Sequence, residues 1–377
     1  DTERYNFSCC YDTNANKIVI AYRDVNNSNK GTCRVLSLSG TTITNGSPIV
    51  FNNANTFQIG TVFDSSQNKV VIFFADAGDS DASTYVVGTV STSSNTATFT
   101  SSTNVNGSDR GEGHSAVFDP AANKILLAYY DPGQGDSYVR KCSLSGNTLT
   151  IGSRETFHNG RANYIRTAWH PANNELYSAY SDNSGNNGKI VAMSMTATGT
   201  GLQRGNNKTF ENSSMYYSDI AYHPLAKRID LVYEDDGTGA FKYTSVTSNT
   251  AAAPTLTIPS EVCIMTSGSC INTERPFIVL HEQTNKFVFF YRHKQANGTA
   301  YLKTHASVYQ PGYDVTNLTT ENFIGISDAA YSDGQTATIQ VVGSVDDAQS
   351  GLTIGKTHYI QKDGSLATTA DTPSVAA

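Results

Sequence analysis

The stretch HSAVFDPAANKILLAYYD, residues 114–131, contains the unit from which most of the chain is built. In it, Asp119 is followed five residues later by Lys124 and ten residues later by Tyr129. The same spacing occurs six times: an Asp or His, a residue that is usually basic at +5, and an aromatic residue at +10. The six copies start at Asp12, Asp64, Asp119, His170, His223 and His281.

The other two positions of the signature are almost as regular. The +5 residues are Lys17, Lys69, Lys124, Glu175, Arg228 and Lys286, and the +10 residues are Tyr22, Phe74, Tyr129, Tyr180, Tyr233 and Tyr291. Successive copies lie 51 to 58 residues apart. A constant core within a variable period indicates one supersecondary unit that is repeated with loops of different length.

Each copy is predicted to be a piece of antiparallel sheet. Two apolar runs separated by a turn such as 120–123 indicate a β-hairpin. The second run lacks polar alternation, which is typical of a strand buried on both faces. A third strand (137–144 in this copy) and a more polar fourth strand (149–157) complete the unit.

Four antiparallel strands per repeat, with the second one buried, are what a β-propeller blade requires. The first strand carries small residues, such as Ser115 and Ala116, which suit a crowded axis. A β-solenoid is the rival, but its repeats are much shorter. Residues 1–313 are therefore predicted to form a six-bladed β-propeller. Since the chain starts on a first strand, either the sixth blade closes the ring by itself or a missing segment adds a seventh.

The pattern changes at residue 314. Segments 335–343 and 352–364 alternate like strands and end in Gly or Asp turns, but they lack the repeat core. Residues 314–377 are predicted to be a separate small β module that is truncated at its end.

Composition excludes several function classes. The 377 residues carry a net charge of −7 without a Lys/Arg cluster, which argues against nucleic acid and anionic membranes as partners. No apolar run approaches the length of a membrane span, so no membrane insertion is expected. The six cysteines lack zinc-site spacing. Cys263 and Cys270 can form a disulfide in an oxidising compartment, and free thiols are the open alternative.

Two stretches resemble a known group of proteins. The segment FDSSQNKVVIFFADAGDSD (63–81), with GTV at 88–90, resembles repeats in large tail-fibre-like structural proteins of marine bacteriophages. Residues 321–377 resemble the module that ends many such proteins. The resemblance implies an extracellular virion tail component with host-attachment as its role. Its implied partners are other virion or fibre subunits, including copies of itself bound through 314–377, and a host-surface glycan. It transfers no catalytic residue.

Binding is expected on the face that carries the variable loops, because such loops on a rigid scaffold are where binding usually occurs. Tyr and Arg offer stacking surfaces and forked donors that suit sugars. The candidates near the channel mouth are Arg4, His114, Tyr164, Arg166, Tyr216, Tyr217, Asp219 and Arg275. The alternative is that these residues only plug the channel and cap loops.

Metal and catalytic sites are not expected, and neither is a cofactor. Asp76, Asp79 and Asp81 form the most acidic loop and are a weak calcium candidate, although Asp at this position also closes hairpins locally. Asp219 with Arg166 and Arg275 is the set that a propeller glycosidase acting on host polysaccharide would use. Sialidase-type repeats, a nucleophile elbow, HExxH and a P-loop are all absent from the sequence. The sequence thus favours a non-enzymatic glycan-binding protein, with a purely architectural protein as the alternative.

Overall fold

The computed structural model describes residues 7–107, 109–196, 201–265, 271–281, 286–294 and 301–309, with short pieces beyond residue 310. The chain divides into two compact units, Asp1–Gln310 and Pro311–Ala377, close to the boundary predicted at 313/314. The described part is β-structure with two 3-10 turns, Val25–Asn27 and Ala77–Asp79. Within it, no helix is long and apolar enough to cross a membrane.

The strands of the first unit follow the repeats. The first two repeats share one long strand, β5; their strands are β1 (Phe7–Asp12), β2 (Lys17–Asp24), β3 (Lys30–Ser39), β4 (Thr42–Asn45), β5 (Ile49–Asp64), β6 (Lys69–Asp76), β7 (Ala82–Val90), β8 (Ala97–Phe99) and β9 (Thr103–Asn104). The third repeat consists of β10 (Glu112–Asp119), β11 (Lys124–Asp131), β12 (Asp136–Ser145) and β13 (Thr148–His158).

The fourth repeat comprises β14 (Ala162–His170), β15 (Glu175–Asp182), β16 (Asn187–Met195), β17 (Leu202–Arg204) and β18 (Lys208–Ser214). The fifth comprises β19 (Ser218–His223), β20 (Arg228–Asp235), β21 (Ala240–Ser248), β22 (Leu256–Thr257) and β23 (Val262–Met265). The sixth has three described strands, β24 (Ile271–His281), β25 (Lys286–Lys294) and β26 (Tyr301–Tyr309).

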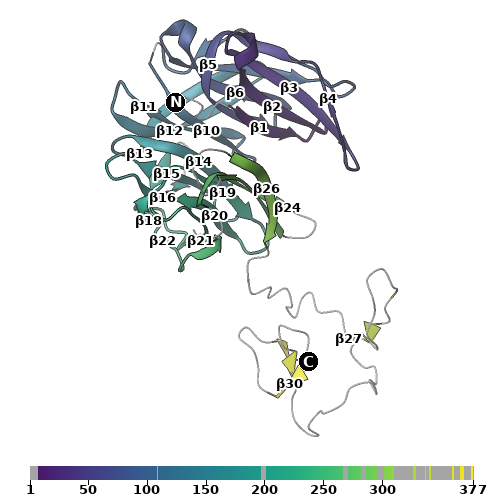
Figure 1. The fold of residues 1–377 in the computed structure, drawn as a ribbon, viewed down its shortest axis with the longest axis vertical. Helices are drawn as coiled ribbons and strands as arrows, with labels where there is room; N and C mark the ends of the chain where they lie inside the picture. The colour runs from purple at the N-terminus through teal and green to yellow at the C-terminus, as the bar shows by residue number, and fades with distance from the viewer. Residues whose placement is uncertain are drawn as a thin grey trace. The chain divides into compact units, whose positions relative to one another are not determined.

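The sheets succeed one another around a common centre, from purple β1 through teal to green β24 and β26 (Figure 1). Within each repeat the first three strands pair antiparallel in chain order, and in the first five repeats a fourth, often interrupted, strand lies outside them. The all-β, propeller-like class and the four-stranded antiparallel sheets are therefore confirmed. The count of six blades stays a prediction at this point.

The second unit is described only in short pairs of strands. β27 (Ile326–Ser327) pairs with β28 (Ile339–Gln340), and β29 (Tyr359–Ile360) pairs with both β30 (Leu366–Ala367) and β31 (Val375–Ala376). The predicted role of 314–377 in self-association stays a prediction.

The repeated signature is turn and core chemistry. Asp119 Oδ1 accepts hydrogen bonds from the amides of Ala121 (2.9 Å) and Ala122 (3.2 Å), and Asp12, Asp64, His170 and His223 hold the same turn in their own repeats. Asn123 follows with φ of 53°, the left-handed conformation that Asn tolerates. In the second to fifth repeats the +10 aromatic is buried, as at Tyr129, which is 1 % exposed.

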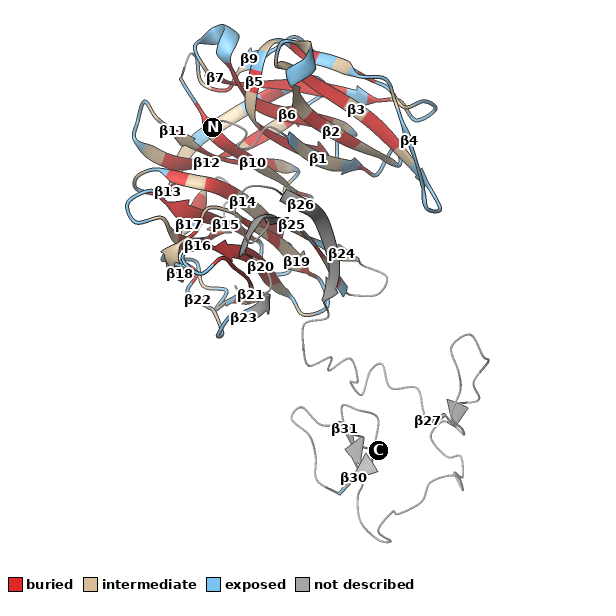
Figure 2. Ribbon diagram, viewed as in Figure 1, coloured by how far each residue is buried: buried red, intermediate tan, exposed pale blue. Residues whose placement is uncertain are grey.

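Five hydrophobic clusters hold the first unit together, and each joins two successive repeats. In the cluster between the second and third repeats, for example, Phe73 of β6 packs with Leu127 of β11. Figure 2 shows the buried residues concentrated in the inner strands, with exposed residues in the turns and outer strands. The second strand of most repeats is covered on both faces, as its unbroken apolar sequence predicts.

Candidate functional site

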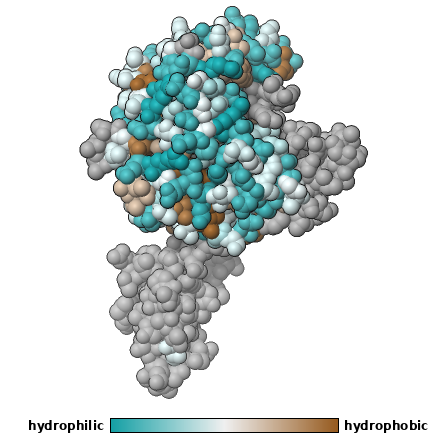
Figure 3. Space-filling model, turned by 90° about the vertical axis from the view of Figure 1, so that its left-hand side faces the viewer, coloured by the Kyte–Doolittle hydropathy of each residue, from teal (hydrophilic) through white to brown (hydrophobic). Residues whose placement is uncertain are grey.

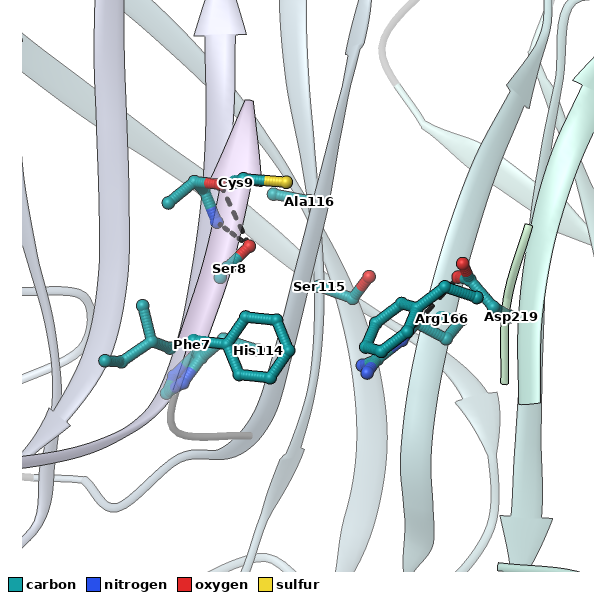
Figure 4. Close-up of a pocket in the computed structure, with 12 residues that line it drawn as sticks. Phe7, Ser8, Cys9, His114, Ser115, Ala116, Arg166 and Asp219 are labelled. Carbon is teal, nitrogen blue, oxygen red and sulfur yellow. Dashed lines mark hydrogen bonds and ion pairs between the residues drawn. The ribbon is translucent and has the colours of Figure 1, made fainter. Parts of the chain in front are cut away.

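The first strands of all six repeats line one cavity of about 210 Å³ (Figure 4). Because each repeat contributes the same part of its first strand, the cavity lies at the centre around which the sheets are arranged. Its lining residues are Phe7, Ser8, Cys9, Ile59, Gly60, Thr61, His114, Ser115, Ala116, Arg166, Asp219 and Phe277.

One ring of equivalent positions gives this cavity its chemical character. Counted from the signature Asp or His, position −4 is occupied by Ser8, Gly60, Ser115, Arg166, Asp219 and Phe277. The first three repeats therefore supply small residues and the last three supply a cation, an anion and an aromatic ring. A Cβ on Gly60 would lie 2.6 Å from the carbonyl oxygen of His114, so the second repeat has no room for a side chain here.

The ring also joins neighbouring repeats. Ser8 Oγ accepts the amide of Thr61 (3.0 Å), and Ser115 Oγ accepts the amide of Thr167 (3.1 Å). Asp219 Oδ2 makes the same contact with the amide of Ile278 (3.1 Å). Asp219 is thus a carboxylate at a position where two other repeats use a serine hydroxyl, and one of its oxygens is held in place by the backbone.

The other Asp219 oxygen meets a cation. Arg166 Nε lies 3.7 Å from Asp219 Oδ1, and the two side chains are 27 % and 18 % exposed. Figure 4 shows the pair side by side, from β14 and β19. Burial raises the pKa of Asp219 to about 6, against the opposing effects of Arg166 and of the amides of Ile278 and Ile220. The site therefore holds a carboxyl group that titrates near neutrality.

Aromatic and sulfur groups complete the lining. The rings of Phe7 and Phe277 are 5.7 Å apart, and Phe7 is 46 % exposed. The thiol of Cys9 is a poor nucleophile, because burial and then the charge of Asp219 raise its pKa. The polar lining is thus suited to hydrogen bonding, and the rings offer apolar surface beside it.

His114 was predicted to contact ligand, but its ring is committed to the protein. Its Nε2 is 2.7 Å from Ser83 Oγ, its Nδ1 is 2.8 Å from the carbonyl oxygen of Gln58, and the residue is 2 % exposed. Burial lowers its pKa to about 4, so the ring is neutral at physiological pH. His114 ties the third repeat to the second and also lines the cavity.

The predicted tyrosines form a neighbouring cluster outside the cavity. The ring of Tyr164 lies 4.8 Å from that of Tyr217 and 6.0 Å from that of Tyr216, in edge-to-face geometry. Tyr164 is 4 % exposed, whereas Tyr216 and Tyr217 are half-buried. Tyr164 also lines a second cavity of about 40 Å³, beside Gln58 and Arg161.

Sequence reasoning missed a bulge near the start of the first strands. Strand pairing shifts register at the same place in four repeats, between Phe57/Gly60, Glu112/Ser115, Asn163/Arg166 and Glu274/Phe277. Within it, Gln58, Gly113 and Tyr164 have φ of 57°, 69° and 55°. Bulges of this kind re-aim side chains. The register shift ends where the −4 ring begins, and this sets which residues face the cavity.

Several predicted residues fall outside the described side chains. Arg4 and Cys270 lie outside the described residues, and the side chains of Arg275 and Cys263 are not described. Neither the disulfide nor the role of the two arginines is therefore tested.

The three residues of the weak calcium candidate serve different local contacts. Asp76 Oδ1 accepts the amide of Gly78 (2.9 Å), Asp79 accepts the side-chain amide of Asn104 (2.7 Å), and Asp81 pairs with Arg110 (3.0 Å). Asp24, Asp131, Asp182 and Asp235 close the same turn in their repeats. No group of three or more His, Cys, Asp or Glu residues in the described part of the chain is placed to hold a metal ion.

Comparison with known proteins shows the fold and not the function. No known family matches the chain, and no curated protein is similar to its sequence. Among solved structures, a protein of unknown function from Dyadobacter fermentans covers 81 % of this chain and 93 % of its own, at 10 % identity and a TM-score of 0.51. AofleA from Arthrobotrys oligospora covers 82 % and 84 %, at 8 % identity and a TM-score of 0.51.

A third structure, a candidate 6-phosphogluconolactonase from Bacteroides uniformis, covers 80 % of this chain and 84 % of its own at 11 % identity. Its TM-score of 0.48 is too low to bear on the chemistry of this chain. The two structures with a TM-score of 0.51 support a propeller-like all-β class, while the residues of the cavity have to be interpreted on their own.

Proposed function

We propose that this chain is a non-enzymatic structural protein of a virion, of the tail-fibre type, which binds a host-surface glycan at the central cavity. The tail-fibre assignment rests on the resemblance of residues 63–81 and 321–377, and the glycan on the site. One observation supports the glycan most directly: the −4 ring places the Arg166–Asp219 ion pair in the same cavity as Phe277, with Phe7 beside it.

A sugar presents hydroxyl groups around its edge and C–H groups on its faces. An arginine beside a carboxylate can donate to and accept from neighbouring hydroxyls, and an aromatic ring can cover a C–H face. Ligand pockets for drug-sized molecules are usually about 300–1,000 Å³, so a cavity of about 210 Å³ suits one small polar unit. We therefore expect a single sugar residue of the glycan to enter the cavity.

The alternative of a glycosidase is less well supported. Hydrolysis of a glycosidic bond ordinarily requires two carboxyl groups on either side of that bond. Among the described residues that line the cavity, Asp219 is the single carboxylate. A purely architectural role would not explain why the last three repeats carry charged and aromatic residues in the ring, although the ion pair would still fill the channel.

A glycan array probed with the full chain tests the proposal, followed by titration of the best sugar. Arg166→Ala is expected to weaken binding by about tenfold or more, since a charge-assisted hydrogen bond is lost. The matched control is Arg110→Ala, because Arg110 pairs with Asp81 away from the cavity. An array without any bound glycan at high protein concentration would refute glycan binding. Release of sugar from a host polysaccharide, abolished in Asp219→Ala, would instead favour the enzyme.

A further inference from the structure

One packing rule relates the five clusters between successive repeats. Positions are again counted from the signature Asp or His of each repeat. In the second strand, the residues at +7 and +9 face the next repeat, and those at +6, +8 and +10 face the previous one. Between the first and second repeats, the rule brings together Val19 and Ala21 with Val70, Ile72 and Phe74. Between the fourth and fifth, it brings together Tyr177 and Ala179 with Ile229, Leu231 and Tyr233. The same rule identifies one such face on the first repeat and one on the sixth that none of the five clusters contains.

The sixth repeat is left with Val288 and Phe290 at +7 and +9, and the first repeat with Ile18, Ile20 and Tyr22 at +6, +8 and +10. None of the five clusters among the described residues joins these two faces. Phe290 is 38 % exposed, whereas its equivalents in the other repeats are fully buried: Ala21, Phe73, Ala128, Ala179 and Val232.

The face on the first repeat shows the same departure. Ile18, Ile20 and Tyr22 are all half-buried. Their equivalents in the second repeat, Val70, Ile72 and Phe74, are fully buried. Two apolar sheet faces of matching type are therefore partly open at opposite ends of the repeat array, and exposing such surface costs about 25 cal/mol for each Å².

The contact between the first strands β1 and β24 indicates which surface covers these faces. Phe7 of β1 and Phe277 of β24 are in ring contact at 5.7 Å, and both line the cavity that the other four first strands complete. At the axis, the first and sixth repeats are thus already neighbours. The first strand of a further repeat would have to separate these two rings.

We infer that the first and sixth repeats form a sixth interface of the same kind, in which Val288 and Phe290 pack against Ile18, Ile20 and Tyr22. The propeller then has six blades and closes by side-chain packing between β25 and β2. In this arrangement the two half-open faces cover each other without a second copy of the chain.

A double-mutant cycle tests the contact, because residues that touch show non-additive effects on stability. Ile20→Ala, Phe290→Ala and the double variant are compared by thermal unfolding. We expect the double variant to lose less Tm than the sum of the two single losses. The control cycle combines Phe290→Ala with Val71→Ala, which lies in the interface between the second and third repeats, and is expected to be additive. Additive losses for Ile20→Ala and Phe290→Ala would overturn the inference.

A second measurement tests whether a second copy of the chain, or water, covers the face around Phe290 in place of the first repeat. Phe290→Lys is expected to lower Tm while leaving the molar mass in solution unchanged. Val25→Lys, at a loop residue that is 63 % exposed, is expected to leave both unchanged. An oligomer that dissociates in Phe290→Lys would show that a second copy covers the face. An unchanged Tm would show that the face remains in water. Either result contradicts closure by the sixth interface.

Discussion

Arg166 and Asp219 occupy the same position in the fourth and fifth repeats, and their side chains meet at 3.7 Å between Nε and Oδ1. The equivalent residues of the first three repeats are Ser8, Gly60 and Ser115, so a repeat that is structurally uniform has been made chemically one-sided. Repetition supplies the rigid ring, and substitution at one position of the repeat supplies the charge. The consequences can be measured through the carboxyl group itself.

The first prediction concerns the stability of the fold as Asp219 ionises. Its pKa in the folded chain, about 6, lies above its ordinary value of 3.8, so the folded state binds the proton more tightly than the unfolded state does. The stabilisation is complete below about pH 3.8 and is lost as pH rises through 6. We expect the stability of the wild type, relative to Asp219→Asn, to fall by about 3 kcal/mol between pH 3.8 and 7.

Urea unfolding of the two proteins at matched pH values measures this difference. Subtracting the variant removes the contribution of other groups, such as Asp230, whose pKa burial also raises to about 6. A difference that does not change between pH 4 and 7 would show that Asp219 has an ordinary pKa and a more hydrated setting than the structure gives it.

The second prediction has the opposite sign and concerns His114. Its pKa is lowered by burial from 6.5 to about 4, so its contribution to stability is present above pH 6.5 and is lost as pH falls through 4. We expect the wild type to lose about 3 kcal/mol more than His114→Gln over this range. Acid unfolding followed by circular dichroism measures it, and parallel curves for the two proteins would contradict it.

The third prediction concerns the first turn of the third repeat. Asn123 has φ of 53°, where Asn and Gly are tolerated and Ala is strained. Asn123→Ala is expected to destabilise the fold by about 1 kcal/mol, whereas Asn123→Gly is expected to be nearly neutral. Thermal unfolding of the two variants provides the comparison. Equal losses would mean that the side chain of Asn123, and not its backbone conformation, supports the turn.

Much of the fold was predictable because the repeat encodes it locally. The Asp or His of the signature bonds to amides two or three residues ahead, and a contact of that range is visible in sequence. The bulge was not predictable, since Gln58 and Tyr164 adopt positive φ without the Gly or Asn that announces it. Tertiary contacts, such as Gln58 Oε1 with the amide of Gly113 (2.9 Å), hold that conformation instead.

The cavity was predictable in part. Arg166 and Asp219 were named from the sequence as binding candidates and do line it, but Phe7, Phe277, Ser8 and Ser115 were not named as candidates. Aligning the six repeats on their Asp or His and comparing position −4 would have found them, because this position changes from small to charged and aromatic. His114 was also named and lines the cavity, but the commitment of its ring to the protein was not predictable. Its partners, Ser83 and Gln58, come from another repeat, and sequence spacing does not show that they occupy both ring nitrogens.

The fourth prediction concerns Glu175, which stands where the other five repeats have Lys or Arg. Glu175 is fully buried and accepts hydrogen bonds from Ser248 Oγ (2.8 and 2.6 Å) and from the hydroxyl of Tyr177 (2.8 Å). Ser248 belongs to the fifth repeat, so this carboxylate links two blades. Glu175→Lys restores the residue typical of the repeat, yet it places an ammonium group opposite donors that have lost their acceptor. We expect it to destabilise the fold by roughly 3 kcal/mol or more.

Glu175→Gln is the matched control, because it keeps the shape and one acceptor oxygen, and we expect it to cost about 1 kcal/mol. Urea unfolding of both variants measures the difference. If Glu175→Lys proved as stable as the wild type, the residue would follow the general pattern of the repeat, and its bonds to Ser248 and Tyr177 would contribute little. A large loss of unfolding free energy in Glu175→Lys with a small loss in Glu175→Gln would show that a contact specific to this pair joins the fourth and fifth blades. The repeat pattern alone, which favours Lys at this position, does not reveal that contact.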